Sequence, residues 1–437
     1  MMSAVIIASI ALAVVLGYKT KINTGFFCIA FAYVIGCFAL GMKTKALIAC
    51  WPTSTMFVIL SVSLFYNFAA VNGTLEKMSS ALLYACRSFP GLLPFALFFV
   101  AVVLSVMGAA YFTVLAFLAP ITLAICEESK MDKLTGAVAI NCGALAGGNF
   151  PTAALGVVFR GLVDTAYEAD PALEALDSFS AELKIFAFAI VFSLILIAIF
   201  RYGFKENKNI GKGVTFKKPE AFDPKQKTTL NLMLIMMAVV LIFPLLKLMM
   251  PGNALIDTIS SKIDVGLVAV CFTVIALLFD LAPQKEVIAR VPWNTIIMIA
   301  GAGMLIAVAV EAGTIDALSA WIGSNVPVAL VPIAFSLVAA FMSFFSSTTG
   351  VVAPALFPLI PALAVSTGLN PAVLFACTVL GAQSSAISPF SSGGSLILGS
   401  CGKEEERNAL FNRLLFVAVP ISVICCAVYN VIVAMIL

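Results

Sequence analysis

The chain has 437 residues, of which 62% are hydrophobic and 11% are charged, and its mean hydropathy of +1.11 excludes a soluble domain. A net charge of +3, with the basic residues placed between apolar runs, excludes a nucleic-acid-binding surface, and the absence of histidine removes the commonest catalytic base and proton switch. The eleven cysteines are scattered without a Cys-x-x-Cys pair, so we interpret them as small core residues. We therefore expect an all-α polytopic membrane protein whose surroundings are the lipid bilayer.

Apolar runs long enough to cross a bilayer, roughly 17–25 residues each, recur along the chain. In the first half we predict spans at 2–18, 24–42, 53–72, 133–164 and 182–202. In the second half we predict spans at 229–250, 264–281, 294–312, 371–400 and 409–436. The first run resembles a signal peptide, but it lacks a basic start and a clear cleavage site, so we interpret it as a span.

Two further apolar stretches, 92–126 and 328–364, are each too long for one helix. Small residues interrupt both of them mid-way, which predicts a re-entrant helical hairpin in each half. Segments 74–91 and 314–327 interleave charged with apolar residues. That pattern is compatible with a helix along the membrane interface and equally with a plain loop.

Polar breaks interrupt the fourth span of each half. The run Gly143–Thr152 contains three glycines, an asparagine and a proline, and residues 381–390 repeat its glycine, alanine and proline 238 positions later. We place the breaks at 147–152 and 383–392. Freed backbone groups at membrane depth are tolerated only where protein buries them or water reaches them. Matched breaks in the two halves of a chain therefore indicate a transporter's binding site.

Other short matches extend the repeat over nearly the whole of each half. Pro52-x-x-Thr55 returns as Pro292-x-x-Thr295, and residues 73–79 return as 313–319, at an offset of 240. Chance likeness between two Leu/Ala/Gly-rich halves is the alternative, but it does not explain a conserved order at a nearly constant offset. A repeat with an odd number of spans must be inverted in the membrane. We predict a first inverted repeat at 1–205, a linker at 206–227 and a second repeat at 228–437.

The loop charges predict the orientation. The connector from Arg201 to Lys227 carries eight Lys and Arg against three acids, whereas 164–182 carries six acids and no base. The positive-inside rule places the connector in the cytoplasm and both termini outside, although Lys43, Lys45 and Arg160 go against the rule. The hairpins then enter from opposite sides, and their tips meet near the midplane.

Helix ends aimed at the midplane suit ions: N-terminal ends attract an anion, and C-terminal ends with free carbonyls suit a hard cation such as sodium. The second half offers many polar groups there: Ser343, Ser346, Ser347, Thr348, Thr349, Gln383, Ser384, Ser385, Ser388, Ser391 and Ser392. The first half offers fewer: Ser105, Gly108, Ala109, Asn149, Thr152 and the carbonyls of Gly147 and Gly148. Small residues also simply allow helices to pack closely, but packing does not require matched breaks with proline.

Charged residues are missing from both breaks and both hairpin tips, which disfavours a proton relay through paired carboxylates. We expect Asp280 and Glu311, at span ends, to be solvated. The spans contain no Ser/Lys or Asp/Asp pair, which disfavours an intramembrane enzyme.

The run from Phe345 to Ile360 resembles the hairpin-tip signature of the ion transporter superfamily, in particular the divalent-anion:sodium symporters and the related malonate and dicarboxylate carriers. In that family a Ser-Asn-Thr triplet at each tip contacts substrate and sodium. Ser347-Thr348-Thr349 matches the second triplet and Ser343 the family's earlier sodium-binding serine. In the first half Ser105 holds that earlier position, but Ala109-Ala110-Tyr111 replaces the triplet. The resemblance implies further ion ligands from 147–152 and 383–388, a homodimer and an elevator mechanism.

We therefore predict a secondary active transporter of the inner (plasma) membrane that imports a small di- or tricarboxylate, preferably a C4-dicarboxylate or malonate, with sodium. The alternative is a sodium- or proton-coupled antiporter of the same superfamily. The candidate substrate-binding residues are Ser347, Thr348, Thr349, Asn149, Pro151, Thr152, Ser388 and Pro389. The candidate sodium-binding residues are Ser105, Gly108, Ala109, Gly147, Gly148, Ser343, Ser347, Thr348, Ser384, Ser385 and Ala386.

Overall fold

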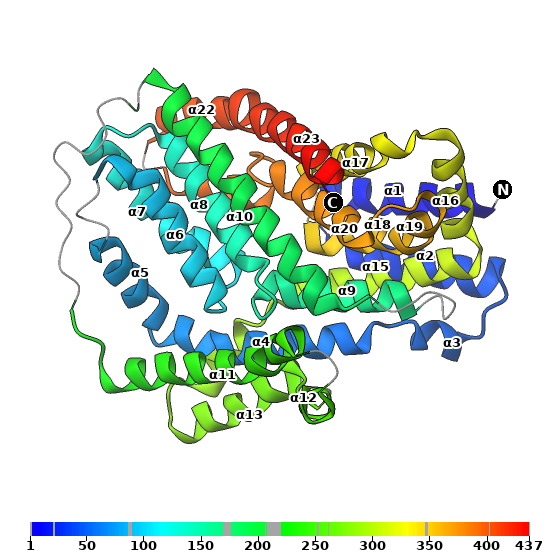
Figure 1. The fold of residues 1–437 in the computed structure, drawn as a ribbon, viewed down its shortest axis with the longest axis horizontal. Helices are drawn as coiled ribbons and strands as arrows, with labels where there is room; N and C mark the ends of the chain where they lie inside the picture. Colours follow the sequence, from blue (N-terminus) through cyan, green and yellow to red (C-terminus); the bar gives the residue numbers. More distant parts are fainter. Residues whose placement is uncertain are drawn as a thin grey trace.

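The structure is a computed structural model that describes residues 2–20, 22–85, 90–168, 176–205, 207, 220–250, 253–260, 262–345, 348–401 and 403–436. These residues form helices joined by short turns, and no strand occurs among them (Figure 1). The all-helical class expected from composition is confirmed. Most of the expected linker, 206–227, lies outside the described residues.

The first half begins with four helices and a short connecting helix. They are α1 (Met2–Thr20), α2 (Thr24–Tyr33, continued by a π-helical turn to Ala39), α3 (Thr44–Ala49), α4 (Thr53–Val71) and α5 (Thr74–Ala85). A helical pair follows, α6 (Leu93–Val106) and α7 (Tyr111–Ser129), and then an interrupted helix, α8 (Lys133–Gly148) and α9 (Ala154–Glu168). The half ends with α10 (Ser178–Gly203).

The second half follows the same order with one additional short helix, α12. It contains α11 (Pro224–Met249), α12 (Ala254–Ser260), α13 (Val265–Leu278), α14 (Gln284–Ala289), α15 (Trp293–Glu311) and α16 (Thr314–Asn325). Its helical pair is α17 (Val331–Phe345) with a segment built from a π-helical turn at Thr348–Val352, α18 (Ala353–Leu356), a 3-10 turn and α19 (Ile360–Thr367). The interrupted helix is α20 (Pro371–Ser384) and α21 (Ser392–Gly399), and α22 (Glu404–Arg413) continues through a π-helical turn into α23 (Val419–Ile436).

Several helices have the length and composition of membrane spans. Five helices of the described part of the chain qualify, or seven when each of two bent helix pairs is taken as one span. One bent pair is α4 and α5, which meet at 69° between Val71 and Thr74. Shorter apolar helices include Leu93–Val106, Val328–Phe344 and Pro371–Ser384. The lengths of Leu93–Val106 and Val328–Phe344 suit elements that end inside the protein, whereas the other arm of each helical pair, Tyr111–Ser129 and Thr348–Thr367, is among the five helices of spanning length.

Helices from the two halves interlock. Helix α2 packs along α15, and α13 packs along α4, so the same two types of helix pair reciprocally across the halves. Helices α11, α12 and α13 lie together at one edge of the molecule, whereas α1, α16 and α19 lie at the end that carries the N-terminus (Figure 1). The first helical pair, α6 and α7, lies toward the opposite end from the N-terminus (Figure 1).

The matched glycines shortly before the two breaks have a packing role. A Cβ on Gly143 would lie 2.4 Å from the carbonyl oxygen of Phe98 in α6, and a Cβ on Gly381 would lie 2.3 Å from that of Ser336 in α17. The two contacts are equivalent, because Phe98 and Ser336 are also 238 positions apart. The absence of a side chain therefore allows α8 to pack directly on the backbone of α6, and α20 on that of α17.

Candidate functional site

The two helix breaks meet in the interior through one pair of amides. Asn149, at the end of α8, donates to Gln383 Oε1 at 3.0 Å, and Gln383, near the end of α20, donates back to Asn149 Oδ1 at 2.7 Å. Asn149 is fully buried and Gln383 is 6% exposed. Each amide therefore satisfies one donor and one acceptor of the other, which fixes the relative position of the two breaks.

An arginine supports the first break. The N–H of Asn149 still bonds the carbonyl of Leu145, so α8 closes normally before the chain turns. The carbonyl of Pro151 then accepts a hydrogen bond from Nη1 of Arg160 at 3.4 Å. Arg160 comes from α9 and lies over the ring of Phe179, 5.3 Å from its centroid. A cation outside the break thus helps to satisfy a carbonyl that the break leaves without a helical partner.

Serine hydroxyls of the second break mostly bond to nearby backbone. Ser384 donates to the carbonyl of Gly381 at 2.7 Å, and Ser385 donates to the carbonyl of Ala340 in α17 at 2.7 Å. Ser391 caps α21 by accepting from the N–H of Gly394 at 3.3 Å. These bonds supply partners where the helix ladder stops, so the serines hold the break as well as offering oxygen atoms.

The first hairpin turns through Gly108, whose φ of +92° favours glycine. Tyr111 begins α7 and donates to Oδ1 of Asn141 in α8 at 2.7 Å. A Cβ on Gly393 would lie 1.9 Å from the hydroxyl of Tyr111, so α21 approaches this tyrosine closely. The tyrosine therefore connects the first hairpin with α8 of the first broken helix and with α21 of the second broken helix.

The second hairpin brings two hydroxyls together. Ser343 of α17 and Thr348 of the following π-helical turn share a hydrogen bond of 3.1 Å. Ser343 is 1% exposed and Thr349 is 7% exposed. Ser346 and Ser347, which lie between these residues in the sequence, are outside the described residues.

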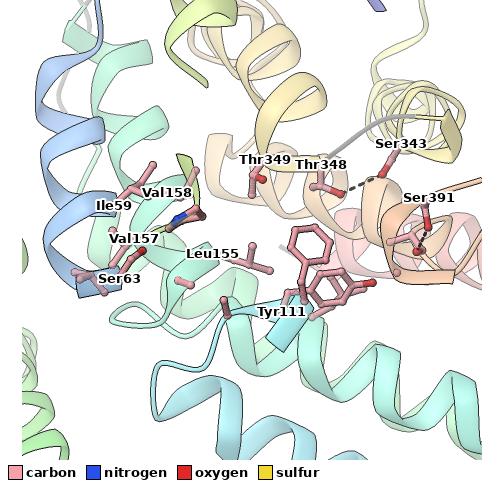
Figure 2. A pocket seen from close by; sticks show the side chains of 18 residues that line it. Ile59, Ser63, Tyr111, Leu155, Val157, Val158, Ser343, Thr348, Thr349 and Ser391 are labelled. Carbon is pink, nitrogen blue, oxygen red and sulfur yellow. Dashed lines mark hydrogen bonds between the residues drawn. The ribbon is translucent and has the colours of Figure 1, made fainter. Parts of the chain in front are cut away.

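A cavity of about 110 Å³ lies between these elements (Figure 2). One wall carries hydroxyls, and the opposite wall is aliphatic and comes from α4 and α9, with the aromatic side chains of α7 between them (Figure 2). The hydroxyl wall consists of Ser343, Thr348, Thr349 and Ser391, and the aliphatic wall includes Ile59, Val62, Leu155, Val157 and Val158. No described residue lining it is charged, so an ion here would depend on hydroxyls and backbone groups for compensation.

The sequence-predicted residues divide into two groups. Those that line the cavity are Ser343, Thr348, Thr349 and Ala386. Those that do not line it but form the breaks and hairpin tips around it are Asn149, Pro151, Thr152, Ser388, Pro389, Ser105, Gly108, Ala109, Gly147, Gly148, Ser384 and Ser385.

Five buried hydroxyls of the first half, those of Tyr66, Ser79, Ser105, Thr122 and Thr152, lack a hydrogen-bond partner among the described residues, and two of them lie at the predicted site. These two belong to Ser105 in α6 and Thr152 in the first break, and both side chains are fully buried. Ser105 packs against Gly147, where an added Cβ would lie 3.0 Å from the Cβ of the serine. Oxygen atoms left without donors are suitable ligands for a hard cation.

Sequence reasoning missed some polar residues of this region. Tyr111 was noted only as a departure from a hydroxyl-rich tip, yet it lines the cavity and bonds Asn141. Arg160 conflicted with the positive-inside rule, and that conflict was the available signal for its contact with Pro151. Glu182 of α10 is fully buried, and its carboxylate oxygens have no hydrogen-bond partner within the described part of the chain.

Comparisons with known proteins agree with a membrane carrier. Residues 1–148 match the family model of the dicarboxylate carrier protein MatC N-terminus. No curated protein matches the chain in sequence.

Two solved structures have a similar fold. The YdaH transporter of Alcanivorax borkumensis has a TM-score of 0.61 and 16% identity over 88% of this chain and 86% of its own. MtrF of Neisseria gonorrhoeae, described with a class of antimetabolite efflux pumps, has a TM-score of 0.61 and 14% identity over 93% of this chain and 84% of its own. At these identities the likeness concerns the fold. Together with the N-terminal match and the spanning helices, it supports a multi-pass membrane transporter.

Proposed function

We propose that this protein is a secondary active transporter that carries a small di- or tricarboxylate, preferably a C4-dicarboxylate or malonate, across the plasma membrane together with sodium. The observation that carries the proposal is the cavity beside the two helix breaks, lined by hydroxyls on one wall. The match of residues 1–148 to a dicarboxylate carrier model supports the substrate class. The protein would move its substrate without chemical conversion.

A carboxylate would bind at the hydroxyl wall. Ser343 and Thr348 share one hydrogen bond, so the hydroxyl that accepts in it could donate to a carboxylate oxygen, at a lining that holds no charged side chain among the described residues. Hydrogen bonds to a charged acceptor are about twice as strong as those between neutral groups. The second carboxylate of the substrate would have to reach Ser63 of α4, the hydroxyl on the aliphatic side of the cavity (Figure 2).

Sodium would balance the charge of the anion. In the second half it would bind near Ser343 and Thr348, whose hydroxyls lie 3.1 Å apart. In the first half the partnerless hydroxyls of Ser105 and Thr152 are the candidates. Oxygen ligands without nitrogen or sulfur favour a hard cation over a transition metal.

The two halves would be inverted repeats that move as an elevator within a homodimer. The shared element order and the reciprocal pairing of α2 with α15 and α13 with α4 support the repeat. In an elevator the hairpins and broken helices would travel together, and the direct backbone contacts at Gly143 and Gly381 would keep each hairpin on its broken helix.

Uptake into proteoliposomes tests the proposal. Radiolabelled succinate or malonate should accumulate when sodium is higher outside, and accumulation should saturate and collapse when the gradient is dissipated. Sodium efflux driven by a proton gradient, without carboxylate flux, would instead identify the antiporter. Flux that neither saturates nor exchanges would indicate a channel.

A further inference from the structure

A second cavity lies on the other side of the first hairpin tip. It has a volume of about 490 Å³ and lies between α7, the bend that joins α4 to α5, and the residue after α14. Its walls include Ala109 and Phe112 from the hairpin, Ala116 from the next turn of α7, and the charged residues Glu76 and Arg290. A third hollow of about 340 Å³ adjoins it through Gly73 and Glu76.

Phe112 is the one described residue that lines both the central cavity and the second cavity. Its ring packs edge-on against Tyr111, with 5.0 Å between the ring centroids. Tyr111 is itself held by the hydrogen bond to Asn141. The phenylalanine is 43% exposed, so cavity space rather than packed protein surrounds much of its side chain. An aromatic ring in this place separates two solvent-accessible spaces with an apolar barrier.

The second cavity opens toward the segment that joins the two halves. The third hollow is lined by Lys77 and Glu220, whose charged groups lie 3.7 Å apart, and Lys77 also donates to the carbonyl of Ala221 at 3.0 Å. Residues 220 and 221 are the end of the basic connector, which loop charges assign to the cytoplasm. The third hollow, the second cavity and the central cavity therefore form a series that runs from the connector side past Phe112 to the hydroxyl wall.

The charges of the second cavity suit a pair of opposite ions. Arg290 donates from Nη1 to the carbonyl of Ala70 at 3.3 Å, and its other N–H groups have no hydrogen-bond partner among the described residues, so they could bind an anion. Glu76 lies in the same lining and would attract a cation. Fixed charges in a concave site raise the local concentration of the opposite charge. The central cavity has no charged lining residue among those described, so the charged residues of the second cavity lie apart from the proposed binding site.

We propose that the second cavity is the vestibule through which a carboxylate passes between the central cavity and the connector side, that Phe112 is its gate, and that Arg290 attracts the anion at its mouth. The role of Arg290 rests on the transport function proposed above, whereas the gate is a property of the cavities alone.

Thiol labelling tests the gate without requiring any transport. Ala154→Cys places a probe in the central cavity and Ala116→Cys a probe in the vestibule. With a membrane-impermeant anionic thiol reagent on the connector side, and peptide mass spectrometry to read each site, residue 116 should react readily. Residue 154 should react slowly, and Phe112→Ala should accelerate it about tenfold while leaving the rate at 116 unchanged. Equal rates at 154 with and without Phe112→Ala would overturn the gate.

Sided kinetics test Arg290. In vesicles of defined orientation, Arg290→Gln should raise the half-saturating succinate concentration on the connector side about fivefold at low ionic strength, as expected for loss of one attractive charge. The effect should shrink in high salt and be absent from the opposite side. Arg290→Lys should restore most of the affinity, and Lys285→Gln on neighbouring α14, outside the vestibule lining, should have no effect. Equal half-saturation for Arg290→Gln and wild type would contradict the role of the arginine.

The two tests separate the hypotheses. If the wild-type protein moves no carboxylate but Phe112→Ala still exposes residue 154, the proposed substrate is wrong and the pathway stands. If carboxylates are transported and neither variant has its expected effect, the transport function stands and the pathway is wrong.

Discussion

The reciprocal amide pair of Asn149 and Gln383 gives the most direct test of how the two breaks are held. Removing one amide, as in Asn149→Ala, breaks both hydrogen bonds and leaves the donor and the acceptor of Gln383 buried. Each unsatisfied buried group costs about 1–3 kcal/mol in proteins generally. Measured couplings between membrane helices are smaller, about 0.6 kcal/mol per hydrogen bond on average. We therefore expect each single alanine variant to lose about 2 kcal/mol of unfolding free energy.

A double-mutant cycle measures the interaction itself. Two hydrogen bonds at about 0.6 kcal/mol each give an expected coupling free energy of about 1.2 kcal/mol between Asn149→Ala and Gln383→Ala. The double variant should thus lose about 2.8 kcal/mol, instead of the loss of about 4 kcal/mol expected for two independent substitutions. Unfolding by denaturant in detergent micelles, followed by far-ultraviolet circular dichroism, provides the four free energies.

The matched control combines Gln383→Ala with Asn325→Ala. Asn325 is an exposed residue whose amide bonds the carbonyl of Trp321 in its own helix, so these two substitutions should be additive. If the Asn149 and Gln383 substitutions are also additive within about 0.5 kcal/mol, the pair does not couple the breaks and the reasoning fails.

Three further substitutions test other parts of the site. Tyr111→Phe removes the hydroxyl that bonds Asn141, and we expect a loss of about 1 kcal/mol in unfolding free energy together with altered uptake kinetics; unchanged values for both would exclude a role for that bond. Thr348→Ala removes a hydroxyl from the polar wall and should raise the half-saturating concentration of substrate or sodium in uptake assays at normal expression, whereas wild-type kinetics would remove this residue from the site. Arg160→Leu removes the guanidinium that donates to the carbonyl of Pro151 and lies over the ring of Phe179, and it should lower the free energy of unfolding by about 1–3 kcal/mol; unchanged stability would show that this arginine does not support the first break.

Much of the helix order follows from the sequence because interruptions of apolar runs leave strong local signals. One helix ends and another begins around Gly147, Asn149 and Pro151. In the structure the helix is interrupted between Gly148 and Ala154. The small residues around Gly108 likewise mark the turn between α6 and α7. The same reading placed the start of the first span of the second half at 229, five residues later than Pro224, because Lys225 and Lys227 were assigned to the basic connector. Asp223 caps that helix in a capping box with Gln226, a signal that the hydropathy of the segment hides.

Pairwise choices within the site do not follow from the sequence. Nothing in the order of residues tells that Gln383 turns toward Asn149 while the neighbouring Ser385 turns toward the carbonyl of Ala340. Such choices depend on the relative placement of helices that are 45 residues apart in one case and 234 in the other. Tyr111 is similar, because its hydroxyl has a partner only once α7 lies beside α8.

The bare backbone contacts at Gly143 and Gly381 set a limit on how the molecule evolves and on how it is engineered. A methyl group at either position would collide with a carbonyl on the adjoining helix, and neither side of that contact is a flexible side chain that gives way. Larger residues there would have to push whole helices apart and would carry the neighbouring amide pair out of register. The two glycines are thus expected to tolerate less replacement than the hydroxyl residues that face the cavity, and libraries aimed at new specificity are best built with both of them held constant.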